Sequence, residues 1–474
     1  MSRPVGVAIL LVLGALVIQV LFEGWLVTRF GARSIDAQGN TIVDPAEWPK
    51  TIKSALYMLL FVLSIVKFSV DRAWHTLTTK ADIALLVLGL VMAVAGVAGG
   101  SSMLLIGQAL FVYFRGVIVF YAFRALRPNW TQVKPLLWIG GTVIAVSTVI
   151  GVVQFWVGKP AYTALGWVDM KWVYENRAHG LFEHPNDLGH LASFMLLGLL
   201  SWFVTAEKIA KRWWVVFALI CAAVSVAQSR QSMLAVMAAF GIVALLRRNR
   251  WKRLILAGTL FVFISSLPVI MSPDNRAQLA YRLGGVFRAL LLPGDRVSFE
   301  ECQRDPRCRG DAEVRVLFIK QGMKLLRASP ILGYGVGQFG GIVAVKADPE
   351  WNKDPRFVEV LGPDGFSMHE FVAVSVDVFW LHLLVEVGAL GMLAYLVWIW
   401  LVSSPVVRAA WRRGPPSEND PIYVWGAATL VFALLTAAWS PVLEDPVFPP
   451  LLFAVLGFGW VLLRKVGERD SQRD

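Results

Sequence analysis

The chain has 474 residues, of which 57% are hydrophobic and 16% charged, and its formal net charge is +12 at neutral pH. An ordinary soluble domain carries roughly 25% charged residues, so this composition excludes a soluble globular protein and indicates a membrane protein. The excess of basic residues predicts contact with anionic lipid headgroups, and we do not interpret it as a nucleic-acid-binding surface, because the basic runs lie beside apolar ones.

Twelve apolar runs in the chain approach the roughly 20 residues with which a helix crosses the ~30 Å hydrocarbon core of a bilayer. They predict an all-α polytopic membrane protein with about twelve transmembrane helices. The first run lacks a small-residue cleavage site and is about twice as long as the apolar part of a signal peptide, so we expect it to be retained. The runs lie near residues 4–27, 52–70, 82–99, 102–124, 135–157, 188–206, 213–228, 231–246, 254–271, 376–402, 421–441 and 447–463.

Lysine and arginine gather in alternate loops, which predicts the orientation because short basic loops remain in the cytoplasm. Both termini are then cytoplasmic, and this requires an even number of crossings. Three parts are expected: residues 1–270 with nine helices, an extracytoplasmic loop region at 271–375, and residues 376–474 with three helices and a cytoplasmic tail. The basic loops are residues 71–80, 123–134, 207–214, 247–253, 408–414 and 464–474.

A polar cluster, ENRAHGLFEHPNDLGH at residues 175–190, separates the fifth and sixth apolar runs. Ionisable residues at the mouth of a membrane helix are costly, so a functional role is the first hypothesis. Arg177, His179, His184 and Asn186 are therefore candidates for binding an anionic substrate. The alternative for an arginine here is an extended side chain that reaches lipid phosphates.

The long outer loop contains Cys302 and Cys308. The outer face of a plasma membrane is oxidising, so a disulfide between them is expected. A metal pair is the alternative, but it has only two thiols, a spacing unlike that of a zinc knuckle, and no histidine nearby in the sequence.

Residues 315–330 carry apolar residues at helical spacing with basic ones between them, which predicts an amphipathic helix along the membrane surface. Pro330 ends this helix. The following Gly335 and Gly337 fit a dinucleotide-binding glycine pattern, which we reject because a helix precedes it and the loop faces away from cytoplasmic nucleotides. A tight turn close to a ligand or a headgroup is expected instead.

Asp377 lies at the outer mouth of the tenth run, and His382 and Glu386 follow at positions i and i+4 of the same helix face. Asp377 takes part in chemistry or caps the helix, since aspartate is a favoured N-cap. His382 and Glu386 form either a functional pair or a buried structural pair.

Four motifs together resemble the O-antigen ligase and O-antigen polymerase superfamily. Residues 177–186 resemble its R-x-x-G-x-F-x-x-P-N signature, and Ser229-Arg230 resembles its S-R step before an apolar helix. Arg315 with residues 329–339 resembles its R…P-x-L-G-x-G-x-x-x-F motif, and residues 377–388 resemble its closing motif. The four occur in the family's order between about residues 170 and 391.

The resemblance implies a type C glycosyltransferase fold that takes glycans from undecaprenyl pyrophosphate on the outer face of the bacterial inner membrane. Ligases of the family transfer the glycan to the lipid A core, and polymerases transfer it to the next lipid-linked repeat unit. Ligases typically have histidine where Asp377 stands, followed by asparagine where Val378 stands, so the chain resembles the polymerase-like members more. A solute transporter is a further alternative, although no inverted repeat is visible.

In that reaction Arg177, Arg230 and Arg315 would bind the pyrophosphate, because the planar guanidinium matches phosphate oxygens. Asp377 is the first candidate for the base that accepts the acceptor's proton, and His369 is the second. No metal motif stands out, so we expect no metal or other cofactor, with arginine taking the metal's role. The resemblance implies lipid-linked donor and acceptor glycans as substrates; anionic lipids, a flippase and a chain-length regulator are further expected partners.

Overall fold

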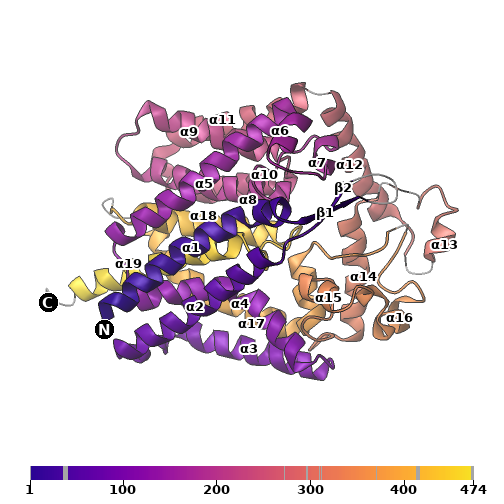
Figure 1. The fold of residues 1–474 in the computed structure, drawn as a ribbon, viewed down its shortest axis with the longest axis horizontal. Coiled ribbons are helices and arrows are strands. Elements are labelled where there is room, and N and C mark those ends of the chain that lie inside the picture. Colours follow the sequence, from indigo (N-terminus) through magenta and orange to yellow (C-terminus); the bar gives the residue numbers. More distant parts are fainter. Residues whose placement is uncertain are drawn as a thin grey trace.

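The computed structural model describes residues 2–35, 41–271, 273–294, 297–308, 310, 312–369, 371–412 and 417–470. These residues are mostly helical, and their only sheet is an antiparallel pair, β1 (Ala32–Ile35) and β2 (Thr41–Asp44), with Ala32 opposite Asp44. Figure 1 shows a bundle of long helices with a layer of short helices at one end.

Nine helices in the described part of the chain are long and apolar enough to cross a membrane. They make this a polytopic membrane protein, as its composition predicted. The nine are α1 (Ser2–Arg29), α2 (Trp48–Val70), α3 (Lys80–Ala98), α4 (Met103–Leu126), α5 (Trp130–Val157), α8 (Pro185–Thr205), α11 (Trp251–Met271), α17 (Phe379–Trp411) and α19 (Phe448–Asp470).

Three further apolar helices are shorter: α9 (Lys211–Val226), α10 (Arg230–Leu246) and α18 (Asp420–Thr436). Each of the twelve predicted apolar runs corresponds to one of these nine long or three short helices. A helix of 16 or 17 residues is at the lower limit for crossing a bilayer. The number of twelve crossings therefore stays a prediction.

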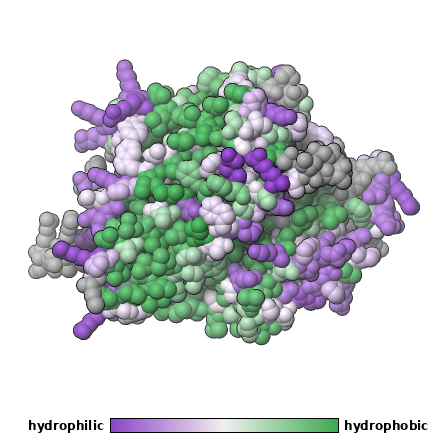
Figure 2. Space-filling model, viewed as in Figure 1, coloured by the Kyte–Doolittle hydropathy of each residue, from purple (hydrophilic) through white to green (hydrophobic). Residues whose placement is uncertain are grey.

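The start of α1 and the end of α19 lie at the same end of the bundle, opposite the layer of short helices (Figure 1). Apolar surface covers much of the bundle in the view of Figure 2, and hydrophilic residues gather toward its two ends. Large apolar side chains are exposed on the helices, including Leu86 at 74% and Leu104 at 72%. Such a surface is stable only in lipid.

The layer at the far end, here called the end layer, runs from α12 to the start of α17 and has an aromatic core of its own. Phe339 contacts the rings of Trp351, Phe357 and Phe366 at centroid distances of 5.3, 5.8 and 4.7 Å. Its elements are α12 (Pro273–Leu291), α13 (Phe299–Cys302), α14 (Val314–Ala328), α15 (Ile342–Ala347), the 3-10 turn Trp351–Lys353 and α16 (Pro355–Leu361).

The predicted amphipathic helix is α14, but its apolar face packs inside the protein and not on a membrane surface. Leu317, Phe318 and Leu325 are buried in the core of the end layer. Gly322 lies so close to α17 that an added Cβ would meet Leu381 at 2.5 Å. An amphipathic helix has the same sequence pattern whether its apolar face packs against protein or against lipid, so the pattern alone could not distinguish the two.

Helix α17 is interrupted at Gly388, whose φ is +63°. The residues after Pro330 pair with the backbone at this break: Ala389 N–H donates to the Pro330 carbonyl at 2.8 Å, and Tyr334 N–H donates to the Val385 carbonyl at 2.9 Å. An added Cβ on Gly388 would lie 2.2 Å from the Ile331 carbonyl oxygen. The glycine-rich segment and the broken helix therefore form one unit.

Two short helices and a turn complete the bundle: α6 (Lys159–Ala164), α7 (Lys171–Tyr174) and the 3-10 turn Trp74–Leu77, with a second 3-10 turn at Arg248–Arg250. Helices α6 and α7 fill the connection between α5 and α8. They lie next to the polar cluster at residues 175–190.

Candidate functional site

Arg177 and Asn186, the first and last residues of the predicted signature, contact each other. Arg177 Nη2 donates to Asn186 Oδ1 at 2.9 Å, and its Nε donates to the Ala227 carbonyl at 3.1 Å. The guanidinium also lies 5.3 Å from the ring of Trp172. Arg177 therefore joins the start of α8 to the connection between α9 and α10.

The remaining signature residues build the turn that leads into α8. Gly180 has a φ of +63°, and an added Cβ would meet Ser147 Oγ at 2.3 Å, so only glycine fits. Gln154 receives the Gly180 N–H at 2.7 Å and donates to its carbonyl at 3.0 Å. Pro185 takes the first turn of α8, where a missing N–H costs nothing.

The two histidines of the signature, His179 and His184, are held by contacts within the protein. His179 is 1% exposed and lies between Trp167 and Tyr162, at ring distances of 4.3 and 5.1 Å, and burial lowers its pKa to about 4. His184 caps α8 by accepting the Asn186 N–H at 3.0 Å, and burial lowers its pKa to about 3. Both imidazoles are neutral at pH 7. The prediction that they bind an anionic substrate is therefore replaced by packing and capping roles.

Arg230 is the first residue of α10 and is half-buried. It follows Ala227, the acceptor of the Arg177 Nε–H, by three residues. Ser229 packs against α8, since an added Cβ on Gly189 would meet it at 2.9 Å. Arg177 and Arg230 thus come from neighbouring segments at the same junction of α8 and α10.

Arg315 and Asp377 lie side by side although 62 residues separate them (377 − 315). Arg315 Nη2 is 3.8 Å from Asp377 Oδ2, while its Nε donates to the Trp439 carbonyl at 2.9 Å and its Nη1 to Glu313 at 3.1 Å. Asp377 is not the N-cap of α17; that position belongs to Val378 and has no side-chain cap. The capping alternative for Asp377 is therefore wrong.

The carboxyl of Asp377 is 53% exposed, so a substrate can reach it. Surrounding protein raises its pKa above the ordinary value, and the charges of Arg315 and of Lys171 oppose this rise. Lys171, in α7, also adds to the lowered pKa of His184. The charge of one lysine thus acts on both the α8 junction and Asp377, a link that no sequence motif indicated.

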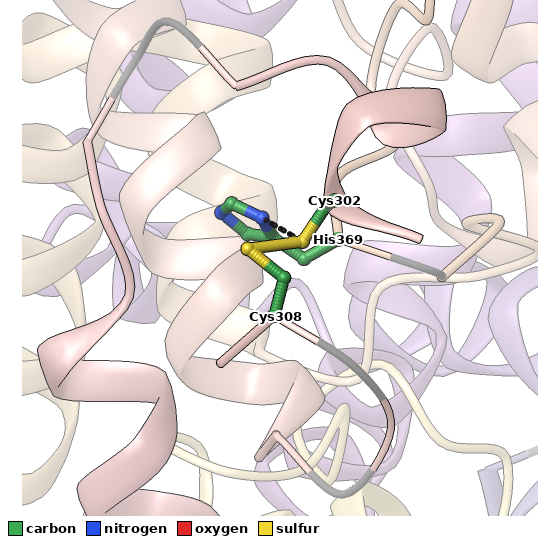
Figure 3. Close-up of side chains that lie close together, drawn as sticks. All are labelled: Cys302, Cys308 and His369. Atoms are coloured by element: carbon green, nitrogen blue, oxygen red, sulfur yellow. Dashed lines mark hydrogen bonds between the residues drawn. A yellow bond between two sulfur atoms is a disulfide. The ribbon is translucent and has the colours of Figure 1, made fainter. Parts of the chain in front are cut away.

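His369, the second candidate base, lies against the disulfide that joins Cys302 and Cys308 (Figure 3). Its Nδ1 is 3.0 Å from Cys302 Sγ and donates to it, since a disulfide sulfur carries no proton. The side chain is 3% exposed, and burial lowers its pKa to about 4. A buried imidazole in this place cannot reach an acceptor hydroxyl, so His369 is replaced as a candidate. No histidine lies near the two cysteines in the sequence, but the fold brings His369 next to them.

Glu386 holds the glycine-rich turn. Its Oε1 accepts the N–H groups of Gly337, Gln338 and Phe339 at 2.8, 3.1 and 3.3 Å. Gly335 N–H donates to the Glu386 carbonyl at 2.8 Å. These amides are already satisfied by the protein, so Gly335 and Gly337 shape the turn and do not offer their amides to phosphate.

His382 lies beside Glu386 in a buried network. Its Nε2 is 3.1 Å from Glu386 Oε1 and its Nδ1 is 3.0 Å from Glu444 Oε2. Tyr113 donates to Glu386 Oε2 at 3.0 Å. The His382 and Glu386 side chains are 4% and 1% exposed, as the structural alternative predicted.

Sequence reasoning missed a basic pocket of about 720 Å³ between the end of α1, β1 and the α6–α7 segment. Arg29, Arg33 and Lys159 line it together with Trp167 and Tyr174. No carboxylate of the described residues forms an ion pair with these three cations. They are far apart in the sequence, so only the fold reveals the pocket.

An apolar cavity of about 430 Å³ lies among α1, α4, α5, α8, α9, α18 and α19. Two clusters of metal-binding residue types also occur in the described part of the chain. In the first, Cys302 and Cys308 already form a disulfide beside His369. The second consists of Asp187, His190 and Asp445.

Residues 214–396 match the family model described as O-antigen ligase. The match covers less than half of the chain and is consistent with the resemblance to the O-antigen ligase and polymerase superfamily. It covers Arg230, Arg315 and Asp377 but begins after Arg177. No curated protein matches the chain.

Proposed function

We propose that this chain, which carries an O-antigen ligase domain, is a glycosyltransferase that polymerises undecaprenyl-pyrophosphate-linked oligosaccharide repeat units on the outer face of the bacterial inner membrane. The observation that carries the proposal is the 3.8 Å approach of Arg315 to the accessible carboxylate of Asp377. The reaction needs a cation beside a departing pyrophosphate and a base beside an attacking hydroxyl, and these two side chains supply that pair.

In the proposed reaction, a hydroxyl of the acceptor glycan attacks the anomeric carbon of the donor sugar. A new carbon–oxygen bond forms as the bond between that carbon and the pyrophosphate oxygen breaks. The hydroxyl proton passes to Asp377, and the electron pair of the broken bond leaves with undecaprenyl pyrophosphate. Arg177, Arg230 and Arg315 stabilise the charge on the leaving group, so the reaction as proposed uses no metal.

The identity of residue 377 supports a polymerase. Arg315 favours the ionised form of Asp377, which is the form that accepts a proton. A histidine at this position could accept the proton only in its neutral form. The following Val378 is buried at the N-cap of α17, so the asparagine of ligase-type sequences has no counterpart here.

The two cavities fit an amphiphilic substrate. The basic pocket presents Arg29, Arg33 and Lys159 to an anionic group, and the exposed ring of Tyr174 gives a sugar a surface for stacking. We propose that this pocket binds the acceptor's phosphate-bearing end. The apolar cavity suits part of a polyprenyl chain, which has no polar groups to satisfy.

The test is turnover of a purified lipid-linked repeat unit by the protein in liposomes, with products separated by length. Asp377→Asn should lower the rate by ~10²–10⁴-fold while donor binding is retained. Arg177→Lys, Arg230→Lys and Arg315→Lys keep the charge but lose the two-pronged geometry, so each should also slow transfer strongly. Arg304→Lys, an exposed change in the end layer, is the matched control. Normal turnover in all three lysine variants would refute the assignment of the arginines.

A ligase is the second candidate, because the family model that matches is described as O-antigen ligase. Supplying a lipid A core acceptor together with the repeat unit separates the two reactions. A ladder of repeat units supports the polymerase, and a single transfer to the core supports the ligase. Solute flux without any glycan transfer would instead identify a transporter.

A further inference from the structure

A buried cluster of Asp187, His190 and Asp445 lies where α8 meets the connection between α18 and α19. One possible ligand atom from each residue lies within 4.8 Å of those of the other two. His190 is 1% exposed, and within the described residues neither of its ring nitrogens has a hydrogen-bond partner. A buried imidazole left in this state is costly, so its surroundings point to a ligand that the protein itself does not supply.

Two cations lie near this cluster. Lys53 forms an ion pair with Glu23 at 2.5 Å, and both Lys53 and Arg115 interact electrostatically with Asp445. The side chains of Asp187 and Asp445 are hydrogen-bonded to each other, so the pair holds one proton. A divalent cation that displaced this proton would be bound by two carboxylates and would give the buried imidazole of His190 the partner that it lacks within the described residues.

We propose that Asp187, His190 and Asp445 bind one divalent cation of the zinc or manganese type. Two carboxylate oxygens and one imidazole nitrogen form a ligand set that such ions use, whereas calcium and magnesium take oxygen ligands. Ligand atoms about 2.1 Å from a tetrahedral ion lie about 3.4 Å apart, so the observed spacing closes with small side-chain rotations. Asp187 and Asp445 are half-buried, which leaves a path for the ion to enter.

The position of the cluster indicates a structural ion and not a step in glycan transfer. Asp187 follows Asn186, the partner of Arg177. Asp445 follows Glu444, which contacts His382. The ion would thus fix the start of α8 to the α18–α19 connection and hold both halves of the proposed active site in place. The inference does not depend on which glycan reaction the protein performs.

The test uses the full-length protein, purified through a histidine-free affinity tag, with its metal content measured by elemental mass spectrometry. We expect about one equivalent of zinc or manganese per chain. After chelation, added Zn²⁺ should raise the thermal unfolding midpoint and saturate at one equivalent. Loss of a residue that only supports a metal ligand typically weakens metal binding by about 10–100-fold. His190→Ala and Asp445→Asn remove ligands themselves, so each should weaken Zn²⁺ binding by more than that.

His75→Ala is the matched control, because His75 is an exposed histidine whose loss should leave the metal content unchanged. If the variants fold poorly, the visible absorption of Co²⁺ bound to the wild-type protein provides the same test, with bands of a nitrogen and oxygen ligand set and no thiolate band. The inference is overturned if the wild-type protein holds no more metal than His190→Ala does. In that case protons alone neutralise the carboxyl groups of the cluster. It is equally overturned by metal that His369→Ala removes and His190→Ala retains.

Discussion

Asp377 combines exposure with a nearby cation, which sets how its activity should depend on pH. Surrounding protein raises its pKa, and Arg315 opposes that rise. The side chain is 53% exposed, so the solvent pH reaches it directly. A base acts only when it is deprotonated, so the rate should fall as the pH drops through the raised pKa of Asp377.

Asp377→His tests this dependence directly. Histidine has an ordinary pKa near 6.5, so a variant that keeps activity should lose it at a higher pH than the wild-type enzyme does. Initial rates between pH 4.5 and 8 measure the shift. Asp348→Asn, a change at an exposed carboxylate of the end layer, should leave the wild-type profile unchanged. Identical acid limbs in the wild type and Asp377→His would show that residue 377 is not the titrating base.

The motif contained both Arg177 and Asn186, but the sequence predicted that they bind substrate and did not predict that they contact each other. It did not distinguish His179, which is packed between two aromatic rings, from a histidine that faces a substrate. It could not place His369 beside Cys302, since 67 residues separate them. The burial of a polar side chain depends on residues brought in by the fold, and one chain's pattern does not record them.

Among the elements, the interrupted helix α17 depends most on one residue type. Gly388→Ala would place a Cβ 2.2 Å from the Ile331 carbonyl oxygen and force an L residue to keep a φ of +63°. The left-handed conformation alone costs roughly 1–2 kcal/mol, so we expect a loss of about 2 kcal/mol or more. Thermal unfolding in detergent measures it. Gly107→Ala, in α4 with open space around its Cβ, should be neutral or slightly stabilising, and equal effects of the two changes would contradict this account.

The segment between Cys302 and Cys308 is a second element with a clear expectation. Peptides from non-reduced protein should contain the two cysteines joined, with a mass lower by two hydrogens than that of the free thiols. Free alkylation of both in membranes would exclude the bridge. Cys302→Ser with Cys308→Ser should keep glycan transfer, because closing so short a loop contributes roughly 2–3 kcal/mol at most.

The elements themselves were largely predictable, since hydropathy alone located all twelve apolar helices. The segments against which these helices pack were not predictable. The sequence pattern of the apolar face of α14 is the same whether lipid or Leu381 covers that face. The break in α17 was invisible, because Gly388 within an apolar run is also compatible with a continuous helix. What the sequence lacks in both cases is the distant segment that completes the contact.

For the whole molecule, the orientation in the membrane is the main prediction. The end layer and the 3-10 turn Trp74–Leu77 belong to opposite ends of the bundle in the predicted topology. A cysteine introduced as Asp348→Cys should react with a membrane-impermeant thiol reagent in intact spheroplasts. One introduced as His75→Cys should react only after permeabilisation. Both positions are exposed, so access within the protein does not limit the reaction, and the reverse pattern would invert the topology.

The pairing between α17 and the residues after Pro330 also bears on how the chain is made. The ribosome produces residues 330–335 before α17, and lipid alone cannot satisfy the open backbone groups at Val385 and Ala389. In the predicted topology, helix α17 therefore completes its hydrogen bonds only after the loop before it has been exported and has folded back. Translocation of the end layer and insertion of α17 would then be coupled events in biogenesis, and a chain stalled between them would carry a helix that the bilayer cannot accept.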